Sequence, residues 1–208
     1  MVQDTSNGPN TSSGGSNRRG PRKATPKYLE NAALFYLQRY ASSAANLERV
    51  LMRKVHRSAR AHGTDAQEGA QQVRDIVAKL QRNGLLDDRL YAESRARSLN
   101  RRGASGRMAR LKLAQEGVGE DHIDHAFKEL ERDCREPDLA AALNYARRRR
   151  IGPYRTDTGS RAANRERDLA ALGRQGFALD LALKILDIES EEELATLEEE
   201  ALGPVGLR

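Results

Sequence analysis

The 208-residue sequence contains one cysteine, no tryptophan and only 4% aromatic residues. Because Cys134 is the only cysteine, no disulfide can form within the chain, which fits a reducing compartment. The shortage of aromatic residues disfavours the stacking platforms with which many proteins hold single-stranded bases. The sequence also lacks an apolar run near the length of about 18 residues that a membrane-spanning helix needs, and its first residues are polar. We therefore expect a soluble, cytoplasmic protein.

Charge is the abundant property of this sequence, and it is distributed unevenly. Lys and Arg number 36 against 30 Asp and Glu, so the formal net charge is +6. From Asp187 onward the chain holds eight acidic residues and one Arg, whereas residues 1–186 carry a net charge of +13. A basic body of this kind favours a polyanionic partner, either nucleic acid or an acidic protein groove.

Apolar residues recur at three- and four-residue intervals along most of the chain, which is typical of amphipathic helices that bury one stripe each. Glycine ends most of these segments, and Ser, Thr or Asp begins the next, as helix caps require. The low apolar share of 38% favours thin helical layers over one thick core. The pattern predicts an all-α protein with nine helices and no strand, over about 25–40, 43–62, 64–83, 87–101, 105–116, 120–133, 136–150, 161–175 and 178–188.

A weak internal repeat groups these helices in threes. The pattern is a Leu, a Gly four residues later, an apolar residue directly after the Gly, and an Asp three residues further on. It predicts a helix that ends on Gly, an apolar residue that packs back, and an Asp near the start of the next helix. The three copies of this pattern are Leu80/Gly84/Leu85/Asp88, Leu113/Gly117/Val118/Asp121 and Leu172/Gly176/Phe177/Asp180.

Two aromatic residues are also assigned from the sequence. We expect Tyr40 and Tyr91 to lie in the core with their hydroxyls directed outward.

The predicted organisation is a tandem array of three-helix units that stack into an elongated, curved body with long binding faces. The units span residues 25–85, 86–134 and 135–188. Residues 1–24 are expected to form a disordered polar and basic tail, because they hold too few apolar residues to offset the entropy of ordering. Residues 189–208 form an acidic extension, which either prolongs the last helix or is a solvated tail.

The sequence offers little that resembles catalytic or metal-binding chemistry. Asp87 and Asp88 are the obvious carboxylate pair, but their place before a helical stripe is explained by capping and by the helix dipole. His122 and His125 share a spacing that could bind a metal, yet no further ligands lie nearby in the sequence. No nucleophile motif and no Gly-rich phosphate loop is present. We therefore expect no enzyme activity, no cofactor and no metal.

Arginines supply the candidate functional residues. A guanidinium group suits both carboxylates and phosphates, because its planar fork donates two parallel hydrogen bonds. Consecutive arginines on a helix point in different directions, so some of them serve only solvation. The predicted partner-binding residues are Arg95, Arg101, Arg102, Arg107, Arg110, Arg147, Arg148, Arg149 and Arg150.

Several segments, in order, resemble the bacterial RecX regulators, and the resemblance extends from Thr25 to about Ile188. The most recognisable segment is Gly84-Leu85-Leu86-Asp87-Asp88-Arg89-Leu90-Tyr91-Ala92-Glu93. It is preceded by Tyr28-Leu29-Glu30-Asn31-Ala32-Ala33-Leu34 and followed by residues 106–118, by Ala146-Arg147-Arg148-Arg149 and by Leu169-Ala170-Ala171-Leu172-Gly173-Arg174-Gln175-Gly176-Phe177.

The resemblance implies a curved array of three-helix repeats that binds along the groove of the RecA–DNA filament. It further implies inhibition of the recombinase, ATPase and co-protease activities of RecA, and therefore regulation of DNA repair, recombination and the SOS response. No catalytic residue is carried over from the family. RecA is the expected partner, the DNA phosphate backbone is a second, and a monomer is expected. The alternative is a helical regulator that binds DNA directly, with a short helix in the major groove and arginines on the phosphates.

Overall fold

The structure is a computed structural model that describes residues 20–202, and residues 1–19 and 203–208 lie outside the described part. Within residues 20–202 it contains ten α-helices, two short 3₁₀ segments and no strand, so the all-α prediction is confirmed. The prediction of nine helices is wrong by one, because the acidic segment forms a helix of its own. Most of the predicted tail, residues 1–24, lies outside the described residues.

The first three helices surround one apolar core. Thr25 caps the first helix by accepting a hydrogen bond from the Tyr28 N–H at 3.2 Å, and Gly63 ends the second in a left-handed conformation with φ 66°. Leu29, Leu47 and Leu51 are completely buried in this core. The helices are α1 (Pro26–Leu37), α2 (Ala44–His62) and α3 (Ala66–Arg82).

The next three helices form a second, separate core. Asp87 caps the first of them by accepting the N–H groups of Arg89 and Leu90 at 2.9 and 3.0 Å, which confirms the capping interpretation for Asp87. Asp88 lies in the first turn and accepts the Ala44 N–H instead. Leu113 and Phe127 lie in the core. The helices are α4 (Asp88–Arg101), α5 (Gly106–Gln115) and α6 (Glu120–Asp133).

The third group holds four helices, because the acidic segment packs onto it. Helix α10 buries Leu197 and Ala201, and the Ala201 carbonyl accepts hydrogen bonds from the Glu136 N–H at 3.2 Å and from Cys134 Sγ at 3.1 Å. The segment is therefore neither a continuation of the preceding helix nor a solvated tail. The elements are α7 (Pro137–Arg149), η1 (Gly152–Tyr154), η2 (Thr158–Ser160), α8 (Arg161–Arg174), α9 (Leu179–Leu186) and α10 (Glu191–Leu202).

The repeated Leu–Gly pattern corresponds to a repeated helix end. At each copy the Gly has positive φ, between 68° and 85°, and the N–H of the next residue reaches back to the carbonyl of the Leu, which is a Schellman motif. Val118 and Phe177 pack inward as predicted, but Leu85 is 58% exposed and Leu86 is buried in its place. Tyr40 is also 57% exposed, because α1 ends at Leu37 and leaves Tyr40 on the surface.

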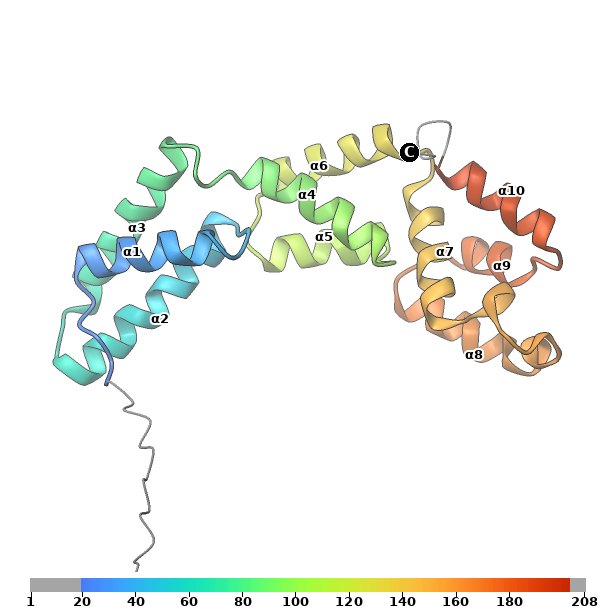
Figure 1. The fold of residues 1–208 in the computed structure, drawn as a ribbon, viewed down its shortest axis with the longest axis horizontal. Helices are drawn as coiled ribbons and strands as arrows, with labels where there is room; N and C mark the ends of the chain where they lie inside the picture. Colours follow the sequence, from blue (N-terminus) through green and yellow to red (C-terminus); the bar gives the residue numbers. More distant parts are fainter. Residues whose placement is uncertain (1–19, 203–208) are drawn as a thin grey trace, which may run out of the picture.

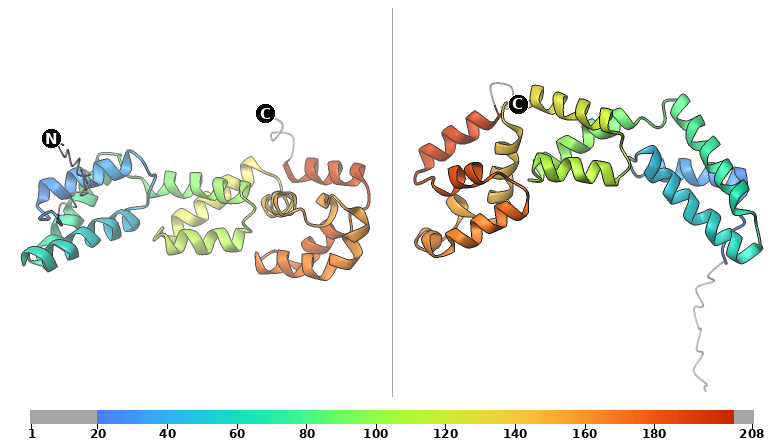
Figure 2. Two further views of the ribbon diagram at one scale, coloured as in Figure 1. Left: turned by 60° about the horizontal axis from the view of Figure 1, so that its bottom comes forward. Right: turned by 180° about the vertical axis from the view of Figure 1, so that it is seen from behind.

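The three groups follow one another along the long axis and form an arch (Figure 1). Two further views show the same succession of groups from other sides (Figure 2). Each group has its own apolar cluster, as expected for a tandem array in which a unit contacts only its neighbours.

The two junctions between groups repeat the same set of contacts. At the first, the Ser43 hydroxyl donates to the Glu116 carbonyl, and the Ala44 N–H donates to Asp88 at 2.7 Å. At the second, the Ser105 hydroxyl donates to the Gln175 carbonyl at 2.6 Å. There the Gly106 N–H donates to Asp138 at 2.7 Å. The serine that caps the second helix of one group therefore also holds the next group in place.

Candidate partner-binding surface

Three of the predicted arginines lie around the turn between α4 and α5. Arg101 ends α4, Arg102 follows it, and Arg107 lies in the first turn of α5. All three are exposed. The turn is tight because Gly103 has φ 77°, which allows the Ala104 N–H to reach back to the Leu99 carbonyl.

The second basic stretch, residues 147–150, comprises the last turn of α7 and the residue that caps it. The helix ends at Arg149, the cap Arg150 has φ 54°, and the Ile151 N–H bonds to the Ala146 carbonyl. Arg147 points toward α10, where it forms an ion pair with Glu198, and its guanidinium lies 5.4 Å from the centre of the Tyr154 ring. The hydrogen bond to Glu198 raises the pKa of Arg147.

Two further predicted arginines have partners within the second group. Arg95 Nη2 lies 2.6 Å from Glu116 Oε1, and this hydrogen bond raises the pKa of Arg95. Glu116 also accepts the Tyr91 hydroxyl at 2.8 Å. Burial, followed by this hydrogen bond, raises the pKa of Tyr91. Arg110 pairs with Asp124 at 2.5 Å and lies over the Phe127 ring. These guanidinium groups help to hold the group together.

Of the nine candidate arginines, three are therefore engaged inside the molecule. The other six are exposed, and among the described residues no carboxylate lies within 4.0 Å of them. They are Arg101, Arg102, Arg107, Arg148, Arg149 and Arg150.

The fold brings the two basic stretches to one junction. A Cβ atom at Gly103 would lie 2.7 Å from the backbone nitrogen of Tyr145, so the α4–α5 turn packs directly against α7. A Cβ atom at Gly176 would lie 3.4 Å from Arg107 Nε, so α5 also meets the end of α8. Figure 1 shows this turn beside α7. Residues about 45 positions apart in the sequence are thus brought to one junction, and we call the exposed arginines of these two stretches the junction surface.

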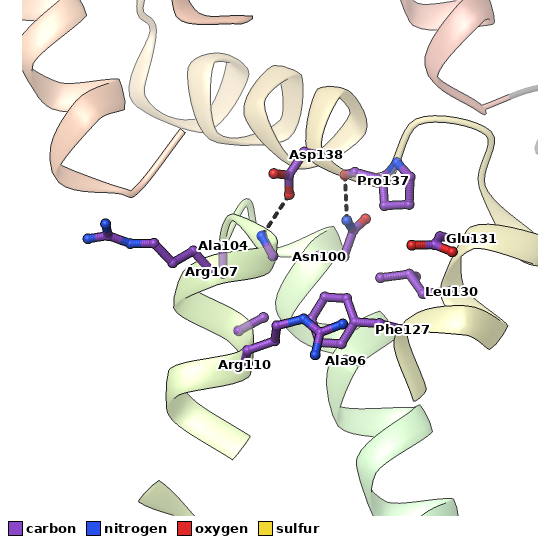
Figure 3. Close-up of a pocket in the computed structure, with 12 residues that line it drawn as sticks. Ala96, Asn100, Ala104, Arg107, Arg110, Phe127, Leu130, Glu131, Pro137 and Asp138 are labelled. Atoms are coloured by element: carbon purple, nitrogen blue, oxygen red, sulfur yellow. Dashed lines mark hydrogen bonds between the residues drawn. The ribbon is translucent and has the colours of Figure 1, made fainter. Parts of the chain in front are cut away.

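A pocket of about 500 Å³ lies at the same junction (Figure 3). Its walls include Ala96, Phe127 and Leu130. Two of its polar groups are paired across the junction, since Asn100 donates to the Pro137 carbonyl at 2.6 Å and Asp138 accepts the Gly106 N–H. Arg107 and Glu131 also line the pocket.

The histidine pair is accounted for by surface contacts. His122 is exposed, and His125 Nε2 lies 3.1 Å from Glu93 Oε1. In the part of the chain that the structure describes, no three His, Cys, Asp or Glu side chains come together as a metal site would require. No helix among residues 20–202 is both long enough and apolar enough to cross a bilayer.

The partner-binding residues predicted from the sequence do not include the arginines of α8. Arg155 and Asp168 form an ion pair at 2.6 Å, and Arg167 and Arg174 lie on the same helix as Asp168. The arginine-rich composition of residues 161–174 was visible in the sequence. The position of α8 beside the end of α7, however, depends on the tertiary packing of the third group.

Comparisons with known proteins give a consistent result. Residues 87–126, which span α4, α5 and the first half of α6, match the family model described as RecX, second three-helix domain. The chain is 46% identical to Regulatory protein RecX of Myxococcus xanthus over 167 residues, or 80% of this chain and 88% of the relative. It is 31% identical to Regulatory protein RecX of Agrobacterium fabrum over 176 residues, or 83% of this chain and 89% of that relative. No solved structure matches the chain significantly. With such identity over most of both sequences and three-helix groups in tandem, this chain belongs to the RecX family of regulatory proteins.

Proposed function

We propose that this chain is a non-enzymatic, cytoplasmic and monomeric regulator that binds the RecA recombinase filament. Binding limits the recombinase, ATPase and co-protease activities of RecA and thereby regulates DNA repair and recombination. Membership in a family of regulatory proteins supports a regulatory role. The observation that supports a filament as the partner is that two arginine-rich stretches meet at one junction of an elongated arch. Six of their arginines are exposed, with no carboxylate within 4.0 Å among residues 20–202.

An arch of successive helical groups suits a helical filament, because it contacts several subunits along a groove at once. The six arginines would meet acidic side chains or phosphates along that groove. Exposed charge pairs are screened by salt, with a Debye length of about 8 Å at physiological ionic strength. Binding should therefore weaken as salt is raised.

RecA-driven DNA strand exchange with and without the protein tests this function. The double charge reversals Arg101→Glu/Arg102→Glu and Arg148→Glu/Arg149→Glu should each weaken inhibition without changing helicity. The matched control is Arg53→Glu/Arg82→Glu, which reverses two exposed arginines on α2 and α3. The control should inhibit like the parent protein. Undiminished inhibition by both junction variants at physiological salt would contradict this account of the contact.

The competing proposal is a regulator that reads DNA directly. It requires binding to duplex DNA with base-sequence preference in the absence of RecA. A gel-shift assay with several duplexes, performed without RecA, distinguishes the two. Sequence-independent binding, or none, agrees with the filament proposal.

A further inference from the structure

A second basic feature adjoins the junction surface and shares Arg149 with it, where the end of α7 faces α8. A pocket of about 520 Å³ is lined there by Arg149, Arg155, Arg167 and Arg174, and we call it the arginine pocket. Asp168 is the only carboxylate among the described residues that line it. The pocket therefore concentrates positive charge in a concave site, where the surrounding protein strengthens the field.

The α8 side of the pocket follows from helix geometry. Arg167 and Arg174 are seven residues apart, which places them two turns apart on one face of the helix. Ala171 lies between them on that face and lines the pocket. Its side chain ends at Cβ, so it adds little bulk to the wall between the two arginines.

Asp168 is already paired with Arg155 and with the Gly152 backbone. It is 3% exposed, and it accepts hydrogen bonds from Arg155 Nη2 at 2.6 Å, from Arg155 Nε at 2.9 Å and from the Gly152 N–H at 3.2 Å. Arg155 and Asp168 therefore form a neutral pair that shapes the wall. Three positive charges remain without a carboxylate within 4.0 Å among the described residues, on Arg149, Arg167 and Arg174.

The composition of the walls indicates the class of ligand. Protein-binding hot spots, arginine included, lie in well-packed and fully desolvated positions, whereas Arg149, Arg167 and Arg174 are exposed and the arginine pocket is lined mainly by polar groups. A phosphate presents several acceptor oxygens, which suit guanidinium groups that converge from two helices. We propose that the arginine pocket binds a phosphate group of a nucleic-acid backbone. This proposal concerns the protein alone and does not depend on binding to RecA.

Fluorescence anisotropy with a labelled DNA oligonucleotide, measured at several salt concentrations and without RecA, tests the proposal. The variant Arg167→Gln/Arg174→Gln should bind at least about tenfold more weakly, as expected when charged hydrogen bonds are removed. Its plot of log affinity against log salt should be shallower, by about 0.7 for each phosphate of single-stranded DNA that the variant no longer neutralises. Inorganic phosphate should compete better than chloride at equal ionic strength.

The matched control, Arg53→Gln/Arg82→Gln, removes the same charge from exposed positions outside the pocket. Its affinity for DNA should stay within about threefold of the parent, since net charge alone acts weakly. A further variant, Ala171→Glu, keeps every arginine but places a carboxylate between them, and it should also weaken binding at least about tenfold. Circular dichroism verifies that each variant is folded.

Equal effects of the pocket and control variants on DNA binding would overturn the proposal. So would a pocket variant that keeps its DNA affinity but loses its affinity for RecA, because the pocket would then bind an acidic protein surface. Loss of DNA affinity with unchanged inhibition of strand exchange by RecA would support the phosphate site. The strand-exchange assay therefore separates this proposal from the proposed function.

Discussion

At the scale of the residue, the helix ends of this chain require a left-handed backbone conformation that few residue types adopt without strain. Glycine occupies most of the left-handed helix ends, but Arg150 takes that conformation at the end of α7 with φ 54°. A left-handed conformation costs a residue with a Cβ atom roughly 1 kcal/mol. The backbone of Arg150 is therefore strained at this position.

Replacing this residue should reveal the strain. We expect Arg150→Gly to raise the free energy of unfolding by about 0.5 kcal/mol, since Gly adopts positive φ freely but loses more entropy on folding. Arg149→Gly, one residue earlier in the helix, should lower it by up to about 1 kcal/mol. Urea denaturation measures both. A loss of stability in Arg150→Gly equal to that in Arg149→Gly would contradict the presence of strain at Arg150.

Tyr91 should make stability depend on alkaline pH. Its pKa in the folded state is raised above the ordinary value near 10, first by burial and then by its hydrogen bond to Glu116. A raised pKa means that the folded state retains the proton longer, so this stabilisation is complete below pH 10 and is lost as pH rises above it. Urea denaturation between pH 9 and about 11 should therefore show a smaller decline for Tyr91→Phe than for the parent. Tyr40→Phe, at an exposed position, controls for loss of a hydroxyl; an identical decline in parent and Tyr91→Phe would refute the assignment.

At the scale of the helix, the sequence predicts boundaries well wherever a cap is local. Ser43, Asp65 and Asp87 each accept N–H groups two or three residues ahead, so the information lies within one turn. The acidic helix α10 could not be predicted in the same way. Its position depends on Leu197 and Ala201 fitting the third core and on Glu198 meeting Arg147, which is 51 residues distant.

Helix α10 should protect the only thiol of the chain. Cys134 is 8% exposed and donates to the Ala201 carbonyl, and burial raises the pKa of its thiol. Because the thiolate is the reactive form, the folded protein should react slowly with a thiol reagent. Leu197→Ala should lower the free energy of unfolding by about 2–4 kcal/mol and accelerate the reaction.

The exposed neighbour Thr196 provides the control for this experiment. Thr196→Ala should leave both the stability and the rate of thiol modification near the parent values, since surface substitutions usually change stability by less than about 0.5 kcal/mol. Thiol reactivity that is unaffected in Leu197→Ala would show that α10 does not cover Cys134 as described.

At the scale of the whole molecule, the repeated junction sets how one group follows another. Gly117 is central to the first junction, because a Cβ atom there would overlap that of Ala45. Gly84 has a similar left-handed backbone, but a Cβ atom placed there would have no non-adjacent residue within 4 Å. Substitutions at the two glycines can therefore be compared: at Gly84 only backbone strain should lower stability, whereas at Gly117 the disturbed junction should lower it further.

We expect Gly84→Ala to cost roughly 1 kcal/mol of stability through backbone strain alone. Gly117→Ala should cost at least about 1 kcal/mol more, because overpacking adds to the strain. It should also speed hydrogen exchange at the Ala44 amide, which bonds to Asp88 across the junction. Equal costs and equal exchange in the two variants would show that the junction does not constrain the arch.

The candidate surface was predictable only in part. Arginine runs in the sequence correctly indicate exposed charge at Arg101, Arg102 and Arg148. They do not indicate that Arg95 and Arg147 form ion pairs with Glu116 and Glu198, because these glutamates lie far away in the sequence. Nor do they indicate that the ends of α4 and α7 meet, which depends on the packing of Gly103 against Tyr145.

Co-sedimentation with RecA filaments assembled on DNA tests the central claim most directly. The claim is that exposed arginines at the junction surface, and not net charge alone, bind the filament. At physiological salt the parent and Arg53→Glu/Arg82→Glu should sediment with the filament, whereas Arg101→Glu/Arg102→Glu should remain largely in the supernatant. Equal sedimentation of the two charge-reversal variants would contradict the claim.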